Sequence, residues 1–208
     1  MTFSIVSSIK NTGELCVATA TCYVAVGSRV PKISPGIGAI AVQATPNPCN
    51  RKKILDLIKK GESNKDAIEK ILKEDKKKEE RQIVVINSKC QSYIFTGKKT
   101  ISISDSLIGD DFAIAGNMLG SNSVVSSMAK AYENNSKSFL PKRLLYALKA
   151  GEEKGGDKRG RMSAAIIYSK PTLKTIVLRI DFSNDPLKDL FKAIELRFSK
   201  NYLDISDH

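Results

Sequence analysis

The sequence predicts an α+β protein in which helices cover antiparallel β-sheet. Strand-like alternation begins at Thr2 and returns in pairs along the chain, and blocks of helical periodicity separate these pairs. Short turn signals join the paired strands, as in Asn11-Thr12-Gly13. The order is hairpin, helices, strands, helices, strands, helix. The amount of strand suggests two sheets packed face to face.

The chain opens on Met1-Thr2-Phe3-Ser4-Ile5-Val6, whose alternation is that of a half-buried strand. A strand that begins at the second residue leaves no flexible leader, so we expect the terminus to be held inside the fold. The segment over 15–26 predicts the second strand of an N-terminal hairpin. The segment over 27–36, with two prolines, predicts a loop.

The remaining elements follow the same two periodicities. Further strands are predicted over 37–42, 82–86, 92–96, 101–103, 112–115, 164–168 and 175–180. Helices are predicted over about 50–60, 64–75, from Ser121 or Ser123 to Tyr132, over 141–150, and from Asp185-Pro186 onward. Asn50 is expected to cap the first helix, Ser63 with Asp66 the second, and Gly151 to end the fourth.

The 208 residues, 41% of them hydrophobic, predict one domain over 1–198 with a tail over 199–208. No apolar run reaches the length of a membrane span, and the N-terminus lacks the pattern of a signal peptide. We therefore expect a cytoplasmic protein without membrane contact.

The sequence favours no cofactor. Its four cysteines lack zinc-ligand spacing, and phosphate loops, dinucleotide fingerprints and metal-ligand clusters are missing. The one histidine is His208, the last residue. Ser-His-Asp and Cys-His mechanisms are thereby excluded, so hydrolytic chemistry needs a base of another kind.

The formal charge is +12, but the densest run, over 73–81, mixes both signs. Only 6% of residues are aromatic, and they do not alternate with basic ones, so nucleic acid is not an expected partner. Abundant Lys with Glu also fits the surface of a heat-adapted protein.

Thr2 is the first candidate for chemistry. Its small side chain favours removal of Met1, which would place a hydroxyl and a free amine on one residue. The amine, with a reference pKa of about 7.7–8.0, can then act as base for that hydroxyl. The alternative is that Thr2 is only a β-branched strand residue.

A second candidate is the glycine-arginine segment, residues 155–163. Its three glycines allow unusual backbone shapes, and Asp157, Arg159, Arg161 and Ser163 bring a carboxylate, two guanidinium groups and a hydroxyl. The segment is either a substrate-binding loop or a structural loop held by an internal Asp157–Arg pair.

Gly116-Asn117 lies between a predicted strand and a predicted helix. The amide that follows the glycine, or the Asn117 side chain, can donate to a developing oxyanion; a turn is the alternative. Gln43 opens a polar bend that ends at Asn47-Pro48, which is structural when taken alone.

Together these segments resemble the domain-of-unknown-function family 1028, whose fold is similar to that of the N-terminal-nucleophile (Ntn) hydrolases. The resemblance covers about residues 1–197. It is carried, in order, by Met1-Thr2-Phe3-Ser4-Ile5-Val6, Gly13-Glu14-Leu15, Val26-Gly27-Ser28-Arg29-Val30-Pro31, Asn47-Pro48, Arg81-Gln82, Gly116-Asn117-Met118-Leu119 and residues 155–165. The resemblance implies a four-layer αββα sandwich, with two antiparallel sheets between helix layers.

Ntn hydrolases cleave amide bonds with a processed terminal Thr, Ser or Cys, a role that the resemblance gives to Thr2. Family members have Ala-Ser-Arg where this chain has Ala20-Thr21-Cys22, so a charged group is missing near the expected site. Proteasome-like members of the wider fold pair the threonine with Asp and Lys, and the sequence alone places neither.

Two hypotheses follow. The first is an amidohydrolase for a small amide or peptide-like substrate, with Thr2, Asn117 and Asp157 as catalytic residues. Its substrate-binding residues would be Gln43, Gly116, Arg159, Arg161 and Ser163. The second is a non-catalytic binding or assembly protein on the same fold. Both are expected to form a homo-oligomer.

Overall fold

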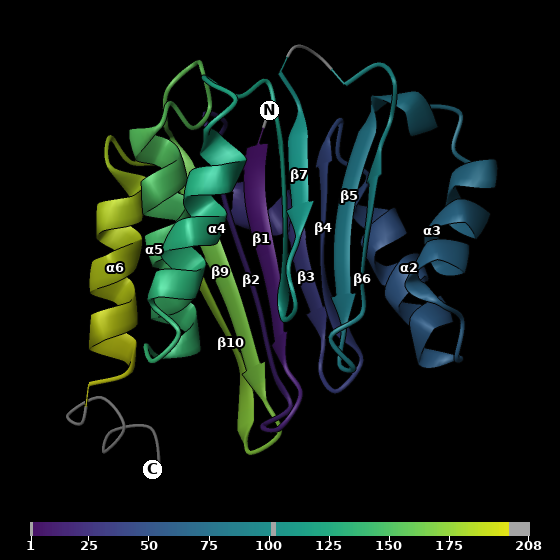
Figure 1. Ribbon diagram of the computed structural model, residues 1–208, viewed down its shortest axis with the longest axis horizontal. Coiled ribbons are helices and arrows are strands. Elements are labelled where there is room, and N and C mark those ends of the chain that lie inside the picture. Colours follow the sequence, from purple (N-terminus) through teal and green to yellow (C-terminus); the bar gives the residue numbers. More distant parts are fainter. Residues whose placement is uncertain (1, 101–102, 200–208) are drawn as a thin grey trace.

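The computed structural model describes residues 2–100 and 103–199, and two antiparallel sheets form its centre (Figure 1). One sheet has the strand order β10-β9-β2-β1-β8-β7, and the other has the order β3-β4-β5-β6. The larger sheet consists of β1 (Thr2–Ile9), β2 (Glu14–Thr21), β7 (Asp105–Ile108), β8 (Phe112–Asn117), β9 (Ser163–Lys170) and β10 (Leu173–Ile180). The smaller sheet consists of β3 (Pro31–Ser34), β4 (Gly38–Ala44), β5 (Arg81–Asn87) and β6 (Ser92–Thr96).

Helices cover the outer face of each sheet. In Figure 1, α4 (Val124–Asn134), α5 (Leu140–Glu153) and α6 (Pro186–Arg197) lie against the larger sheet. On the opposite side, α2 (Pro48–Lys59) and α3 (Asn64–Lys73) cover the smaller one. This arrangement confirms the four-layer αββα sandwich expected from the sequence.

The core consists of three apolar layers, one in each gap. Phe3 and Ile5 of β1 pack towards α4 and α5, whereas Ile40 and Val42 of β4 pack towards α2 and α3. Between the sheets the side chains are smaller, with Val6, Ala41, Val84, Ala113 and Ala165 among them. Alternate residues of a strand point to opposite faces, so each central strand contributes to two layers.

The first strand differs from its prediction in one informative way. It is buried on both faces, because β2 and β8 flank it and the smaller sheet covers the face that was expected to meet water. Ser4 is therefore fully buried between the sheets. There its hydroxyl donates to Gln43 Oε1 at 2.6 Å and lies within hydrogen-bond distance of Thr19 Oγ1, at 2.9 Å.

The region after the hairpin was predicted incorrectly. The second strand ends at Thr21, and the helical turn α1 (Val26–Arg29) begins after four intervening residues. The segment over 27–36, expected to be a loop, holds most of this turn and all of β3. The cause is tertiary: Asp157 accepts the Cys22 N–H at 2.8 Å, and Ser163 Oγ donates to the Tyr23 carbonyl. These bonds draw the chain away from the sheet.

Three local predictions also need correction. Asn47, not Asn50, caps α2 by accepting the Cys49 N–H at 3.2 Å. Gly151 lies inside α5, where a Cβ would come within 2.7 Å of Met128 on α4, so the glycine serves close packing and does not end the helix. Strand β7 was not predicted, and the predicted strand over 101–103 lies mostly outside the described residues.

The other predicted helices and strands are confirmed within a few residues, including the Ser63 cap, whose hydroxyl accepts the Asp66 N–H at 3.1 Å. The domain boundary at residue 198 stays a prediction, because residues 200–208 are outside the described part. Within that part, no helix is long and apolar enough to cross a membrane.

A buried ion pair fixes the start of β5. Asp75 accepts hydrogen bonds from Arg81 Nε at 3.0 Å, Arg81 Nη2 at 3.1 Å and Asn50 Nδ2 at 2.8 Å. Arg81 also donates to the Thr45 carbonyl, which lies just beyond β4. The pair thereby connects α2, the segment after α3, and the bend after β4. The hydrogen bonds from Arg81 are the main reason why the pKa of Asp75 is below its usual value.

Gln43 on β4 bridges the two sheets: its Nε2 donates to the Ala115 carbonyl of the larger sheet and to Gln82 Oε1 of its own. We predict that Gln43→Leu destabilises the protein by about 1–3 kcal/mol, because it removes this amide and leaves buried acceptors without their donor. Urea denaturation measures this loss. Gln91→Leu is the matched control: Gln91 is exposed, so its replacement should change stability by less than about 0.5 kcal/mol. Equal effects of the two substitutions would contradict the bridging role of Gln43.

Asp75→Asn should cost about 3–5 kcal/mol at neutral pH, since it leaves the Arg81 guanidinium buried without its counter-ion. The folded pKa of Asp75 is depressed, so its contribution is present above the unfolded value of about 3.9 and is lost as the pH falls through the folded pKa. The stability gap between wild type and variant should therefore shrink below about pH 4.

Asp56→Asn provides the control, because Asp56 pairs with Lys52 on the surface and an exposed pair contributes about 0–1 kcal/mol. A constant gap between wild type and Asp75→Asn from pH 7 down to pH 3 would show that the ion pair is not its cause.

Candidate active site

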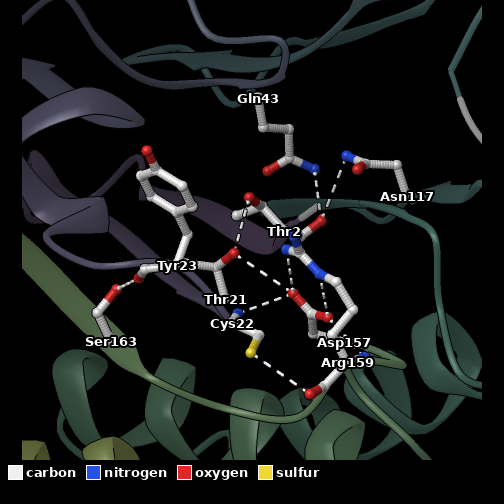
Figure 2. Close-up of polar contacts among 9 residues, drawn as sticks. All are labelled: Thr2, Thr21, Cys22, Tyr23, Gln43, Asn117, Asp157, Arg159 and Ser163. Carbon is white, nitrogen blue, oxygen red and sulfur yellow. Dashed lines mark hydrogen bonds and ion pairs between the residues drawn. The ribbon is translucent and has the colours of Figure 1, made fainter. Parts of the chain in front are cut away.

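Thr2 is held at the end of β1 through its own backbone carbonyl. Gln43 Nε2 donates to this oxygen at 3.2 Å, and Asn117 Nδ2 donates to it at 3.4 Å (Figure 2). The two amides come from different sheets, because Gln43 lies on β4 and Asn117 on β8. The position of Thr2 is thus fixed at the junction of the two sheets.

The amide of Gln43 continues into a buried hydrogen-bond network. Its Nε2 also donates to the Ala115 carbonyl at 3.0 Å and to Gln82 Oε1 at 2.8 Å. Gln82 Oε1 accepts a second bond from Asn117 Nδ2 at 2.9 Å, and Gln82 Nε2 donates to the Gly116 carbonyl at 3.0 Å. We call Ser4, Gln43, Gln82 and Asn117 the inter-sheet network; all four are buried.

The hydroxyl of Thr2 points towards Thr21 and, beyond it, Asp157. Thr2 Oγ1 lies 3.4 Å from Thr21 Oγ1, and Thr21 Oγ1 lies 3.4 Å from Asp157 Oδ2 (Figure 2). Thr21 is directly available because β2 runs beside β1, and Phe3 pairs with Ala20. The chain thus brings a hydroxyl, a second hydroxyl and a carboxylate into one line.

Asp157 is the centre of the glycine-arginine segment. Its carboxylate is fully buried and accepts hydrogen bonds from the Cys22 N–H at 2.8 Å and the Arg159 N–H at 2.9 Å. Arg159 Nε at 3.3 Å and Nη2 at 3.1 Å complete the set. These bonds raise the pKa of Arg159 above its ordinary value, so the guanidinium stays charged.

The glycines of this segment adopt the backbone shapes that the sequence led us to expect. Gly155, Gly156 and Gly160 have φ values of 110°, 40° and 109°, which favour glycine. The segment also pairs with the turn after β8, where Leu119 forms a bridge with Asp157 and the Gly120 N–H donates to the Gly156 carbonyl at 3.0 Å. This pairing brings Asp157 to the sheet end that carries Thr2.

A pocket of about 300 Å³ opens over Thr2, and we call it the Thr2 pocket. Its lining residues are Thr2, Thr21, Tyr23, Val26, Arg29, Val30, Ala44, Thr45, Pro46 and Arg159. Asn117 lines a different hollow, of about 320 Å³, together with Thr45 and Met118.

Three of the four non-glycine residues with positive φ in the described chain lie at or beside the two hollows. Ala44, which lines both, has φ 69°, Ala25 beside Val26 has φ 55°, and Met118 in the second hollow has φ 49°; the fourth, Cys90, lies elsewhere. A left-handed conformation in a residue with a side chain costs about 1–3 kcal/mol and tends to occur at functional sites. The strain is therefore a second sign that this end of the sandwich is specialised.

The residues predicted from the sequence are only partly brought together. Thr2, Gln43, Asn117, Asp157 and Arg159 meet at the end of the sandwich (Figure 2). Gly116 is adjacent, with its carbonyl bonded to Gln82. Ser163 lies behind the pocket wall, where its hydroxyl donates to the Tyr23 carbonyl and accepts the Val26 N–H at 3.1 Å.

Arg161 lies apart from this group. It donates to Glu152 at 2.8 Å and to the Asn184 carbonyl at 3.0 Å, and it does not line the Thr2 pocket. Sequence reasoning missed Tyr23, Arg29 and Gln82. The strand prediction over 15–26 hid the turn that carries Tyr23, and the loop prediction over 27–36 hid the helical turn that carries Arg29.

Cys22 lies beside the glycine-arginine segment. Its N–H donates to Asp157 at 2.8 Å and its thiol donates to the Arg159 carbonyl at 3.4 Å, and Arg159 lines the Thr2 pocket. Among residues 2–100 and 103–199, no group of three or more His, Cys, Asp or Glu side chains is placed to hold a metal ion.

Comparisons with known proteins give a family and a fold. A crystal structure of a protein from Silicibacter pomeroyi assigned to DUF1028 matches with a TM-score of 0.92 and 29% identity, over 99% of this chain and 89% of that one. Two weaker matches follow. Anbu (ancestral beta-subunit) from Yersinia bercovieri matches with a TM-score of 0.40 and 9% identity, over 98% of this chain and 96% of that one. An Anbu (Gly-1) mutant from Hyphomicrobium sp. strain MC1 matches with a TM-score of 0.42 and 11% identity, over 99% of each chain.

No curated protein matches the chain. The family of unknown function DUF1028 matches residues 2–190, which is most of the sequence. The chain therefore belongs to the family of unknown function DUF1028.

Proposed function

We propose that this protein is an amidohydrolase of the N-terminal-nucleophile type, acting on a small amide or peptide-like substrate through Thr2. The observation that carries the proposal is the placement of the Thr2 hydroxyl in a pocket, 3.4 Å from Thr21 Oγ1, with a buried Asp157 behind Thr21. A β-branched strand residue with no chemical role needs neither the pocket nor the carboxylate.

Removal of Met1 is a requirement of this proposal, and Met1 itself lies outside the described residues. The released amine of Thr2 would be the base. The only histidine, His208, also lies outside the described residues, and no other imidazole exists in the sequence. An amine with a reference pKa of about 7.7–8.0 is partly neutral near pH 8 and can accept a proton there.

The proposed reaction has two halves. Thr2 Oγ1 attacks the substrate carbonyl carbon while its proton passes to the Thr2 amine, and the ammonium then returns a proton to the leaving nitrogen as the amide bond breaks. This leaves an ester on Thr2. Water then attacks the ester, the amine again accepts the proton, and the carboxylic acid leaves as the hydroxyl is restored.

The neighbouring residues take supporting roles. Thr21 and Asp157 orient the Thr2 hydroxyl, and the guanidinium of Arg159, held by Asp157, is available to the oxygen that becomes negative. Asn117 donates to the Thr2 carbonyl and to Gln82, so we assign it a positioning role in place of the oxyanion role expected from sequence. Gln43 shares that role.

The test compares chains that begin at Thr2 with chains that retain Met1. We expect a β-lactone probe to label Thr2 in the chain that begins at Thr2. The hydroxyl opens the lactone ring and forms an ester without a leaving group, so the chain gains the full mass of one probe molecule. The rate should rise between about pH 7 and 9 as the amine loses its proton. Intact mass and peptide mapping give the adduct and its position.

Thr2→Val is the matched variant, since it keeps the β-branched shape and removes only the hydroxyl. It should abolish labelling with little change in stability, whereas Thr2→Ser should retain labelling. Equal labelling of Thr2→Val, or of chains that retain Met1, would overturn the proposal and favour a non-catalytic binding protein. Homo-oligomer formation, a cytoplasmic location and heat adaptation remain predictions.

A further inference from the structure

The charges on the wall of the Thr2 pocket are one-sided. Arg29 and Arg159 line it, and none of its described lining residues is Asp or Glu. The carboxylate of Asp157 is fully buried and already binds Arg159 through two side-chain bonds. Among the described residues that line the pocket, the positive charge of Arg29 therefore has no counter-charge.

Arg29 is exposed, and its guanidinium carbon lies over the Tyr23 ring, 5.4 Å from the ring centre. An arginine held against an aromatic ring keeps its planar fork free for bidentate hydrogen bonds. The five N–H groups of this fork match the two oxygens of a carboxylate.

The backbone that carries Arg29 is firmly held. Arg51 of α2 donates through Nη2 to the Ser28 carbonyl at 3.0 Å and through Nη1 to the Pro31 carbonyl at 2.8 Å. Ser163 bonds the Val26 N–H at 3.1 Å. The cation therefore projects from a fixed rim and not from a loose surface loop.

Apolar side chains share the pocket wall with Arg29 and the reacting residue. Val26, Val30 and Pro46 line the same pocket as Thr2, and its volume is about 300 Å³. This volume is at the lower limit of ligand pockets, which fits a small molecule and not a long peptide.

We infer that the Thr2 pocket selects substrates that carry a carboxylate on a short apolar stem, with Arg29 binding that carboxylate and Thr2 facing the scissile amide. The substrate class is thus the monoamide of a small dicarboxylic acid, or an amide of similar shape. The identity of the reacting group rests on the proposed function, whereas the binding of the carboxylate does not.

Calorimetric titration of the full chain with glutarate and glutaramide tests this inference. The two molecules have similar size, but glutaramide lacks the charges. We expect glutarate to bind and glutaramide to bind at least tenfold more weakly. Arg29→Gln should raise the Kd of glutarate at least tenfold. Lys142→Gln should leave it unchanged, because Lys142 pairs with Glu195 and does not line the pocket.

Three results would overturn the inference: equal affinity for glutarate and glutaramide, no effect of Arg29→Gln, or inorganic phosphate binding as tightly as glutarate. The titration is repeated on Thr2→Val, which separates the two proposals. Arg29-dependent glutarate binding without β-lactone labelling of the wild type would refute only the catalytic proposal. Labelling of Thr2 without a preference for glutarate would refute only the carboxylate assignment.

Discussion

The hydrogen bonds of Gln43 between the two sheets are the constraint on which the candidate site depends. One amide nitrogen reaches Thr2 and Ala115 on the larger sheet and Gln82 on its own sheet, while its oxygen accepts from Ser4. A fully buried amide is stable only where its partners are fixed, so the spacing and register of the two sheets are coupled at this point. The same bonds set the position of Thr2.

The site is assembled from segments far apart in the chain, and each is fixed by bonds that do not involve a ligand. Asp157 binds the backbone at Cys22, Arg81 binds the Thr45 carbonyl, and Arg51 binds the backbone around α1. A pocket whose walls are held in this way is pre-organised, and pre-organised groups lose little entropy when a substrate binds. Ala25, Ala44 and Met118, which have positive φ, are the residues at which the backbone of these segments is strained.

Charge divides the pocket into two ends. Asp157 forms an ion pair with Arg159 beside the threonine hydroxyls, which orients the guanidinium and keeps it protonated. Arg29 stands at the rim against Tyr23. This separation places one oriented cation near the proposed reacting bond and one near the part of a substrate that would be recognised. The short substrate that we propose agrees with the small volume of this pocket, about 300 Å³.

The sequence by itself determined the period of nearly every element, and therefore the α+β class and the candidates Thr2, Asp157 and Arg159. Periodicity is local, and the glycines of residues 155–160 require backbone shapes that few other residues adopt. The sequence did not determine that β1 is buried on both faces, because the sheet that carries Gln43 comes from distant segments and covers Ser4. Only the tertiary structure decided that Arg29, and not Arg161, lines the pocket. Contacts from Ser163 and Arg51 fold residues 26–31 into place, and Glu152 binds Arg161 elsewhere. Partners this distant in the chain leave no periodic signal in sequence.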